Sequence, residues 1–260
     1  MRFRTYCTVL CLSLGLMMPV SSPMAASVSM NEDFRQALSV TFKQMISSYQ
    51  RGEKAPLNGD ILDTANPAVA DFFNFDSSIV HREKGATSPD QSIALRFYKD
   101  AVLDGQKTSA CLMSFNSRNP NFLSGYESTR LFTKAETTYY LAAHEFGHCA
   151  ALHQASLGNM KAIAVGEDHE LFADQYALAF FLSQSQENTA KKIIAFNRTS
   201  VSESDFHYHP EELEAFFDAF PKPGSKELSK LQNTYDLVAL TIKVAAKAKF
   251  SSQATASSSN

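Results

Sequence analysis

The sequence of 260 residues contains no tryptophan, few cysteines and little excess charge of either sign. Its formal net charge is −3, from 24 Lys and Arg against 27 Asp and Glu. A strongly basic binding surface is therefore not expected, which argues against nucleic acid as a partner. With 44% hydrophobic and 20% charged residues, the composition is typical of a globular protein rather than a disordered or fibrous one.

Long apolar runs are also missing, except near the N-terminus. Residues 6–20 form an apolar run, shorter than the roughly 20 residues that span a membrane. Two arginines precede this run and small residues follow it, with Ala25 or Ala26 as the expected cleavage position. We interpret residues 1–26 as a secretory signal peptide, with an uncleaved anchor as the alternative. The mature protein is then expected to be periplasmic or secreted, with no stable membrane insertion.

Only two cysteines remain after removal of the signal peptide, Cys111 and Cys149. In an exported protein a single remaining pair favours one disulfide bond, and two buried free thiols are the alternative. A bond between them would join a strand expected around residues 108–116 to a helix expected over residues 134–156.

The pattern of apolar residues predicts one mainly helical α+β domain over residues 27–250, followed by a disordered tail over residues 251–260. A small sheet is expected around residues 108–132, residues 53–66 resemble a loop, and a short helix or turn is expected at residues 68–75. Helical spacing, caps and breakers predict seven helices, over residues 31–52, 88–105, 134–156, 167–184, 186–197, 210–220 and 226–250.

The helix expected over residues 134–156 contains ionisable side chains within a mostly apolar sequence. It contains His144, Glu145 and His148, although its other faces offer no polar surface. Burying such groups without partners costs several kcal/mol, roughly 2–7 for a polar group. His144 and His148 are four residues apart and share one helix face, so both rings can bind one ion. This H-E-x-x-H spacing predicts two zinc ligands, with Glu145 as the general base beside a zinc-bound water.

A third ligand is needed, and the sequence excludes one common source. The metzincin pattern requires Gly and His where this chain has Ala151 and Gln154. Downstream, Glu170 and Asp174 again share a helix face, so Glu170 could complete a His-His-Glu site. Glu167 lies on that same face and stays open as a rival ligand. Asp174 could accept a hydrogen bond from the free ring N–H of a ligand histidine.

The stretches "HEFGH" and "ELFAD" together resemble the gluzincin metallopeptidases, whose motifs are H-E-x-x-H and E-x-x-A-D. They are most similar to small secreted bacterial members, and the resemblance covers about residues 139–182. It implies a zincin-like fold with a small sheet beside the H-E-x-x-H helix, a Zn²⁺ cofactor and a peptide or protein substrate. It also implies these roles: zinc ligands His144, His148 and Glu170, general base Glu145, and supporting carboxylate Asp174.

Other candidates surround this motif pair. The loop "HYH" contains His207, Tyr208 and His209, any of which could donate a hydrogen bond to the oxyanion of the reaction, although ordinary loop residues are the alternative. His153 and His169 are expected to be partly exposed helix residues near the site. Gly147 could allow a neighbouring backbone to pack closely against this helix, and simple tolerance of a glycine is the alternative. The strand at residues 108–116 could be an edge strand that aligns substrate or a core strand.

The sequence therefore predicts an exported zinc-dependent metallopeptidase that hydrolyses peptide bonds, with Glu145 activating water. A secreted metal-binding interaction module without catalysis is one alternative. A zinc hydrolase of non-peptide amides, such as those of cell walls, is another. The substrate and the oligomeric state are not predicted.

Overall fold

The structure is a computed structural model that describes residues 24–52, 56–63, 93–103, 105–115, 129–160, 167–201, 203 and 207–257. Most of the predicted signal peptide and the helix or turn expected at residues 68–75 lie outside these ranges. None of the helices within them is long and apolar enough to cross a membrane.

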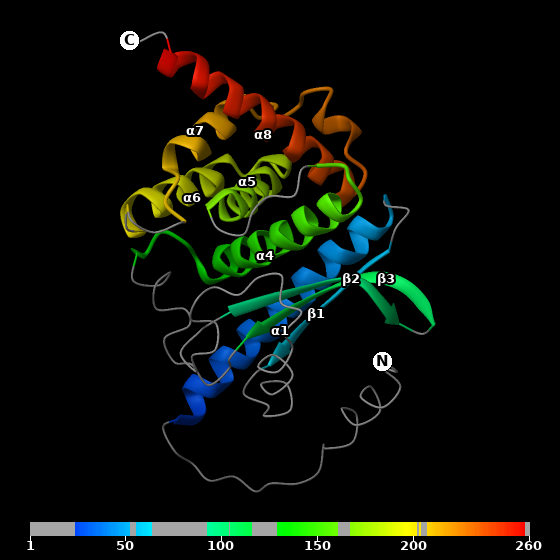
Figure 1. Cartoon of the computed structure of the whole chain (residues 1–260). Coiled ribbons are helices and arrows are strands. Elements are labelled where there is room, and N and C mark those ends of the chain that lie inside the picture. The colour runs from blue at the N-terminus through cyan, green and yellow to red at the C-terminus, as the bar shows by residue number, and fades with distance from the viewer. Residues whose placement is uncertain are drawn as a thin grey trace, which may run out of the picture.

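Helices dominate the chain, and a three-stranded mixed sheet completes an α+β fold, as the sequence predicts (Figure 1). In chain order the elements are α1 (Met24–Gln50), β1 (Leu57–Asp63), β2 (Ile93–Leu103), β3 (Gln106–Phe115), α4 (Lys134–Ser156), α5 (Glu167–Ser183), α6 (Glu187–Ser200), α7 (Pro210–Ala219), the 3₁₀ turn η2 (Leu228–Lys230) and α8 (Thr234–Ser257).

The sheet has the strand order β1-β3-β2, with β3 parallel to β1 and antiparallel to β2. The predicted strand around residues 108–116 is confirmed, and it is the central strand rather than an edge strand. The prediction of a helix over residues 88–105 is wrong for the part that the structure describes, because residues 93–103 form strand β2. Its turn into β3 contains Gly105 at a φ of 79°, a conformation that favours glycine.

Strand β1 lies where the sequence resembles a loop, so that expectation is wrong. Leu57 and Ile61 are buried, while Gly59 allows the strand to lie directly on α1. A Cβ atom added at Gly59 would lie 2.8 Å from Ile46 Cδ1 of α1. The glycine that resembles a loop residue is therefore required by close helix-to-strand packing.

The helix boundaries differ from the predictions mainly at the two ends of the chain. Helix α1 begins at Met24, seven residues before the predicted start at residue 31. Helix α8 begins at Thr234, several residues later than predicted, and continues to Ser257 through a segment whose composition predicts disorder. Helices α4 to α7 match the predicted ranges within a few residues.

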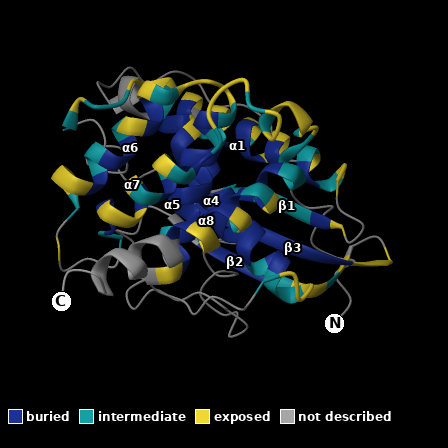
Figure 2. Ribbon diagram, turned by 90° about the horizontal axis from the view of Figure 1, so that it is seen from above, coloured by how far each residue is buried: buried dark blue, intermediate teal, exposed yellow. Residues whose placement is uncertain are grey.

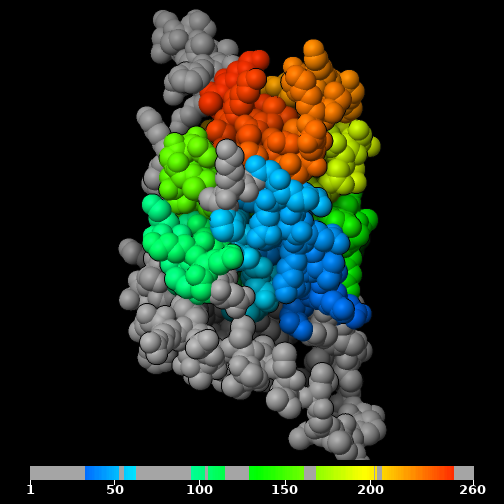
Figure 3. All heavy atoms as spheres, turned by 90° about the vertical axis from the view of Figure 1, so that its right-hand side faces the viewer, coloured from blue at the N-terminus to red at the C-terminus, as the bar shows by residue number. Residues whose placement is uncertain are grey.

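Helix α4 occupies the middle of the fold. In Figure 1 the sheet and α1 lie on one side of it and α5 on the other, with α6, α7 and α8 packed around α5. Figure 2 shows the buried residues concentrated along α4, α5 and the sheet. Figure 3 shows α8 beside the end of α1, where the backbone N–H of Thr234 donates to Ser48 Oγ at 3.0 Å.

Candidate metal centre

The start of α4 is fixed by a capping box between Thr133 and Glu136, which form a T-x-x-E pattern in the sequence. The side chain of Thr133 accepts from the backbone N–H of Glu136 at 3.2 Å, and Glu136 accepts from the backbone N–H of Thr133 at 2.7 Å. Lys192 of α6 donates to the same carboxylate at 2.8 Å. Burial raises the pKa of Glu136, but the hydrogen bonds from Lys192 and Thr133 outweigh it and lower the pKa to about 2.

The middle of α4 is buried on all sides, and its three ionisable residues are buried with it. His144, Glu145 and His148 are only 9%, 7% and 6% exposed. A helix that is covered on every face cannot offer these side chains bulk water as a partner. Their partners must therefore come from the protein or from a bound group.

Helices α4 and α5 approach each other most closely at Gly147. A Cβ atom added there would lie 2.8 Å from Ala173 Cα, so no larger residue fits without movement. Close packing of a neighbouring backbone at Gly147 is thus confirmed. It brings Glu170, one turn before Ala173 on α5, next to the two histidines of α4.

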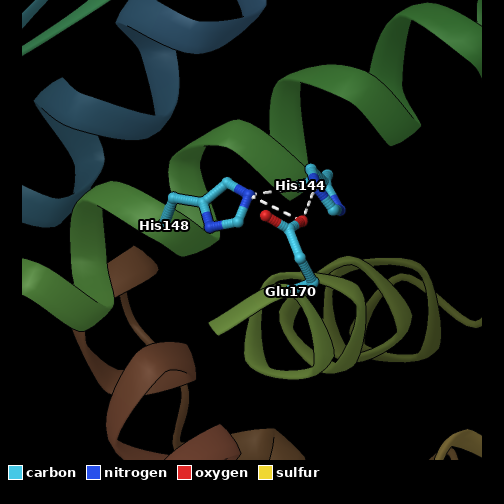
Figure 4. A group of neighbouring side chains, drawn as sticks. All are labelled: His144, His148 and Glu170. Atoms are coloured by element: carbon cyan, nitrogen blue, oxygen red, sulfur yellow. Dashed lines mark hydrogen bonds and ion pairs between the residues drawn. The ribbon is translucent and has the colours of Figure 1, made fainter. Parts of the chain in front are cut away.

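Three side chains converge at this crossing (Figure 4). The Nε2 atoms of His144 and His148 lie 3.1 Å apart, and Glu170 Oε2 lies 3.2 Å from each of them. Among the described residues, these three form the cluster of side chains that could hold a metal ion, with one ligand atom from each. Helix α5 begins at Glu167, the rival ligand, whose side chain lies outside the described residues.

The chemistry of these atoms fits a bound cation. Glu170 Oε2 is buried, and its polar neighbours among the described residues are imidazole nitrogens, with those of His144 and His148 at 3.2 Å. His144 uses its Nδ1 for Asp174, at 2.8 Å from Oδ1. A neutral ring that donates from Nδ1 presents the lone pair of Nε2, which here faces Glu170 and His148. A positive charge is therefore needed between these atoms, either a bound cation or a proton on one of the rings.

The carboxylates supply negative charge to this buried space. Burial raises the pKa of Glu170, but the neighbouring imidazoles of His148 and His144 outweigh it, so the pKa lies far below its ordinary value. Burial likewise raises the pKa of Asp174, and His144 and His209 lower it more. Burial lowers the pKa of His144, while Asp174 and Glu170 raise it overall. Both carboxylates therefore stay ionised, which favours a cation.

Asp174 organises more of the site than the sequence predicts. Its Oδ1 accepts from His144 and also from the hydroxyl of Tyr140 at 2.9 Å, and its Oδ2 lies 3.2 Å from His209 Nε2. Sequence reasoning missed these roles of Tyr140 and His209. Tyr140 lies one turn before His144, a spacing that places the two side chains on one helix face.

The loop before α7 reaches the same carboxylates. His207 Nε2 lies 3.4 Å from Glu170 Oε2, and its side chain is 34% exposed. Asn197 of α6 holds this loop, because its side-chain amide donates to the backbone carbonyl of His207 and accepts from the backbone N–H of His209. Tyr208 is half-buried, and among the described residues it has no hydrogen bond or ion pair with the three ligands.

The expectation that His153 and His169 are partly exposed is wrong, because both are 0% exposed. His153 faces away from the ligands and its Nδ1 lies 2.9 Å from the hydroxyl of Tyr49 on α1. His169 contacts the metal centre, with its Nδ1 2.6 Å from that of His148. Both lie on nearly all-apolar helices, which is the signal that could have predicted their burial.

The predicted disulfide between Cys111 and Cys149 is confirmed, with the two Cα atoms 5.8 Å apart. It joins β3 to α4 at the residue that follows His148. The metal-centre helix is thus linked covalently to the sheet on one side and packed against α5 on the other.

Comparison of the chain with protein-family models, with curated proteins and with solved structures returned no match. The resemblance to gluzincins therefore remains a prediction from two short motifs. The geometry around His144, His148 and Glu170 is the basis on which a function can be proposed.

Proposed function

We propose that this protein is an exported zinc-dependent metallopeptidase of the gluzincin type, with a zincin-like fold. The observation that carries the proposal is the convergence of three ligand atoms, from His144, His148 and Glu170, within 3.2 Å of one another. Glu145, the expected base, is buried on the same helix next to the first ligand.

Zinc is the metal that this set of ligands favours. Two imidazole nitrogens and one carboxylate oxygen are common zinc ligands, with bonds of about 2.0–2.2 Å, and tetrahedral geometry then places ligand atoms about 3.3 Å apart. The observed separations of 3.1 and 3.2 Å match this spacing. The ligand cluster therefore has the size of a zinc site before any rearrangement.

The number of ligands supports a catalytic site over a structural one. Structural zinc sites usually have four protein ligands, whereas catalytic sites have three and leave a position for water or substrate. Within the described ranges, the cluster contains three side chains that could bind metal. A binding module without catalysis would also have no use for Glu145.

The chemistry follows from the roles that these residues can perform. Zinc, when bound, acts as a Lewis acid that polarises the scissile carbonyl and lowers the pKa of water. Glu145 accepts a proton from the attacking water and returns it to the leaving amine. His207 is close to Glu170 and partly exposed, so it can donate a hydrogen bond to the oxyanion that forms on the carbonyl. Asp174 keeps the ring of His144 oriented.

Export is supported by the disulfide between Cys111 and Cys149. Such bonds persist in oxidising compartments, such as the periplasm and the extracellular space, and are rare in the cytosol. A secretory signal at residues 1–26 would deliver the chain to such a compartment.

The test combines metal analysis with a peptide-library cleavage assay, with and without chelator. The purified protein should contain about one zinc per chain and cleave peptides only when loaded. Two matched substitutions separate the roles. Glu145→Gln should keep zinc and lose activity by at least about a hundredfold, as expected for a general base. Glu170→Gln should lose both.

The outcomes that contradict the proposal are specific. Full peptidase activity in Glu145→Gln would mean that another group accepts the proton. Zinc loading without any peptide cleavage, combined with cleavage of cell-wall amides, would assign the site to a different substrate class.

A further inference from the structure

His148 is paired with a second histidine, His169, which neither motif includes. Their Nδ1 atoms lie 2.6 Å apart, their ring planes differ by 14° and their ring centroids are 4.5 Å apart. Because the nitrogens are much closer than the centroids, the two rings approach each other through their Nδ1 edges. The separation of the two nitrogens is that of a hydrogen bond, with one ring as donor and the other as acceptor.

The direction of this hydrogen bond follows from the other side of His148. Its Nε2 faces His144 Nε2 at 3.1 Å and Glu170 Oε2 at 3.2 Å. A neutral imidazole that offers the lone pair of Nε2 to a metal carries its proton on Nδ1. His148 then donates from Nδ1, so His169 accepts at Nδ1 and carries its own proton on Nε2.

Burial makes this partner difficult to replace. His169 is 0% exposed, so bulk water cannot take its place as acceptor. The other ligand histidine, His144, donates to the charged carboxylate of Asp174 at 2.8 Å. The two ligand rings thus have different partners, one anionic and one neutral.

We propose that His169 is a positioning residue that fixes the ring orientation and the tautomer of His148 for metal binding. The inference rests on the zinc site proposed above. Hydrogen-bond partners of ligand histidines typically contribute about 10- to 100-fold to metal affinity. His169 would supply this contribution with an imidazole, where Asp174 supplies it to His144 with a carboxylate.

Two substitutions of nearly equal size test the acceptor directly. In His169→Asn, the side-chain oxygen follows the same bond path as Nδ1 and can accept from His148. In His169→Leu, a methyl group occupies that position and cannot accept. The measurement is the zinc dissociation constant, by competition with a chromophoric chelator, together with the absorption spectrum of the Co²⁺-loaded protein.

We expect His169→Leu to weaken zinc binding by about 10- to 100-fold and to alter the Co²⁺ spectrum. His169→Asn should stay within a few-fold of the unchanged protein. If the Leu variant does not fold, His169→Gln replaces it, because its acceptor lies one bond further out and misses His148. His153→Leu is the control, since it removes a buried histidine from α4 without touching a ligand.

Each result has one meaning. Unchanged zinc affinity in His169→Leu, or equal losses in the Asn and Leu variants, would overturn the role of His169 while leaving the zinc site intact. A loss in His153→Leu as large as in His169→Leu would show that packing alone causes the effect. An unchanged protein that binds no zinc would overturn the site itself and the role of His169 with it.

Discussion

Helix α4 carries two buried polar clusters that differ in one respect. On the side of α1, the hydroxyl of Tyr49 lies 2.9 Å from His153 Nδ1 and 2.5 Å from the side-chain amide of Gln154. The Tyr49 hydroxyl can donate to His153 and accept from Gln154, so it links two side chains of α4. On the side of α5, His148 Nε2 and Glu170 Oε2 lie 3.2 Å apart, and both are acceptors when the ring is neutral with its proton on Nδ1.

The difference shows that burial of histidine does not by itself indicate a metal site. His148 and His153 lie on the same helix, five residues apart, and are similarly buried at 6% and 0% exposure. What distinguishes them is the set of partners, a tyrosine hydroxyl for His153 and a second imidazole with a carboxylate for His148. The four predictions that follow test this distinction, and the first has the largest expected effect.

Alanine substitutions at His148 and at His153, made in two separate variants, should differ strongly in their effect on zinc binding. We expect His148→Ala to weaken zinc binding by more than about a hundredfold, because even groups that only support a ligand contribute about 10- to 100-fold. His153→Ala should bind zinc within about twofold of the unchanged protein, since nothing near the ion changes. Isothermal titration or chelator competition measures both, and equal losses would remove the distinction between the clusters.

Removal of the disulfide should affect stability far more than metal affinity. Cys111 and Cys149 are 38 residues apart in sequence, and replacement of both by serine should lower the free energy of unfolding by about 2–4 kcal/mol. The ligand atoms lie on the α5 side of α4, so zinc affinity of the folded protein should change little. Urea unfolding with and without zinc tests this, and a large loss of affinity at equal foldedness would contradict it.

The cluster on the α1 side should respond to the loss of one hydroxyl group. Tyr49→Phe leaves His153 and Gln154 without their shared partner in a buried space. We expect a loss of about 1–3 kcal/mol in the free energy of unfolding, with zinc affinity unchanged. Thermal unfolding of the zinc-loaded and chelated proteins provides the measurement. A matched change on the surface, Tyr139→Phe, should have almost no effect, because Tyr139 is 45% exposed.

The smallest effect is expected at the start of α4, which both clusters share. The pKa of Glu136 is lowered from 4.5 to about 2 in the folded protein. Its contribution to stability is therefore complete above pH 4.5 and is lost as the pH falls toward 2. Since solvent partly screens the ion pair with Lys192, we expect a loss on the order of 1 kcal/mol. Glu136→Gln should remove this part of the pH dependence, as followed by urea unfolding between pH 5 and 2.5.

Local sequence signals predicted α4 and the clustering of His144, His148 and Glu170. Thr133 and Glu136 define the cap, and the four-residue spacings around His144 and Glu170 place each ligand on one helix face. These features depend on neighbours within one turn, which the sequence displays directly. The disulfide could be predicted because only two cysteines remain after residue 26.

The sheet was predicted poorly because its signals are ambiguous or depend on distant residues. In β2 the apolar residues also fit helical spacing. The pair Asp104-Gly105 is a strong hairpin signal, but a glycine at this position also fits the end of a helix. In β1, Gly59 resembles a loop residue until α1 is placed against it. Tertiary packing therefore decided both segments, and no local propensity could.

The sequence also did not predict which residues contact the ligand side chains and Asp174. Tyr140, His169 and His209 each contact a ligand or Asp174, but from three different elements of the fold. His169 is the clearest case, because it adjoins Glu170 and was expected to be partly exposed. Its apolar helix indicates burial, but only the packing of α5 against α4 shows that its ring contacts His148.

The contact between Gly147 and Ala173 has a consequence for the choice of metal. Two ligands lie on α4 and one on α5, so the separation of these helices sets the distance between their ligand atoms. The two backbones lie close at this crossing, since an added Cβ would lie 2.8 Å from Ala173 Cα. The ligand atoms, 3.1–3.2 Å apart, suit an ion with bonds near 2.0–2.1 Å, whereas calcium has bonds of about 2.3–2.6 Å and takes six to eight oxygen ligands. A larger side chain at position 147 would push α5 away from α4 and so widen the spacing between the two histidines and Glu170.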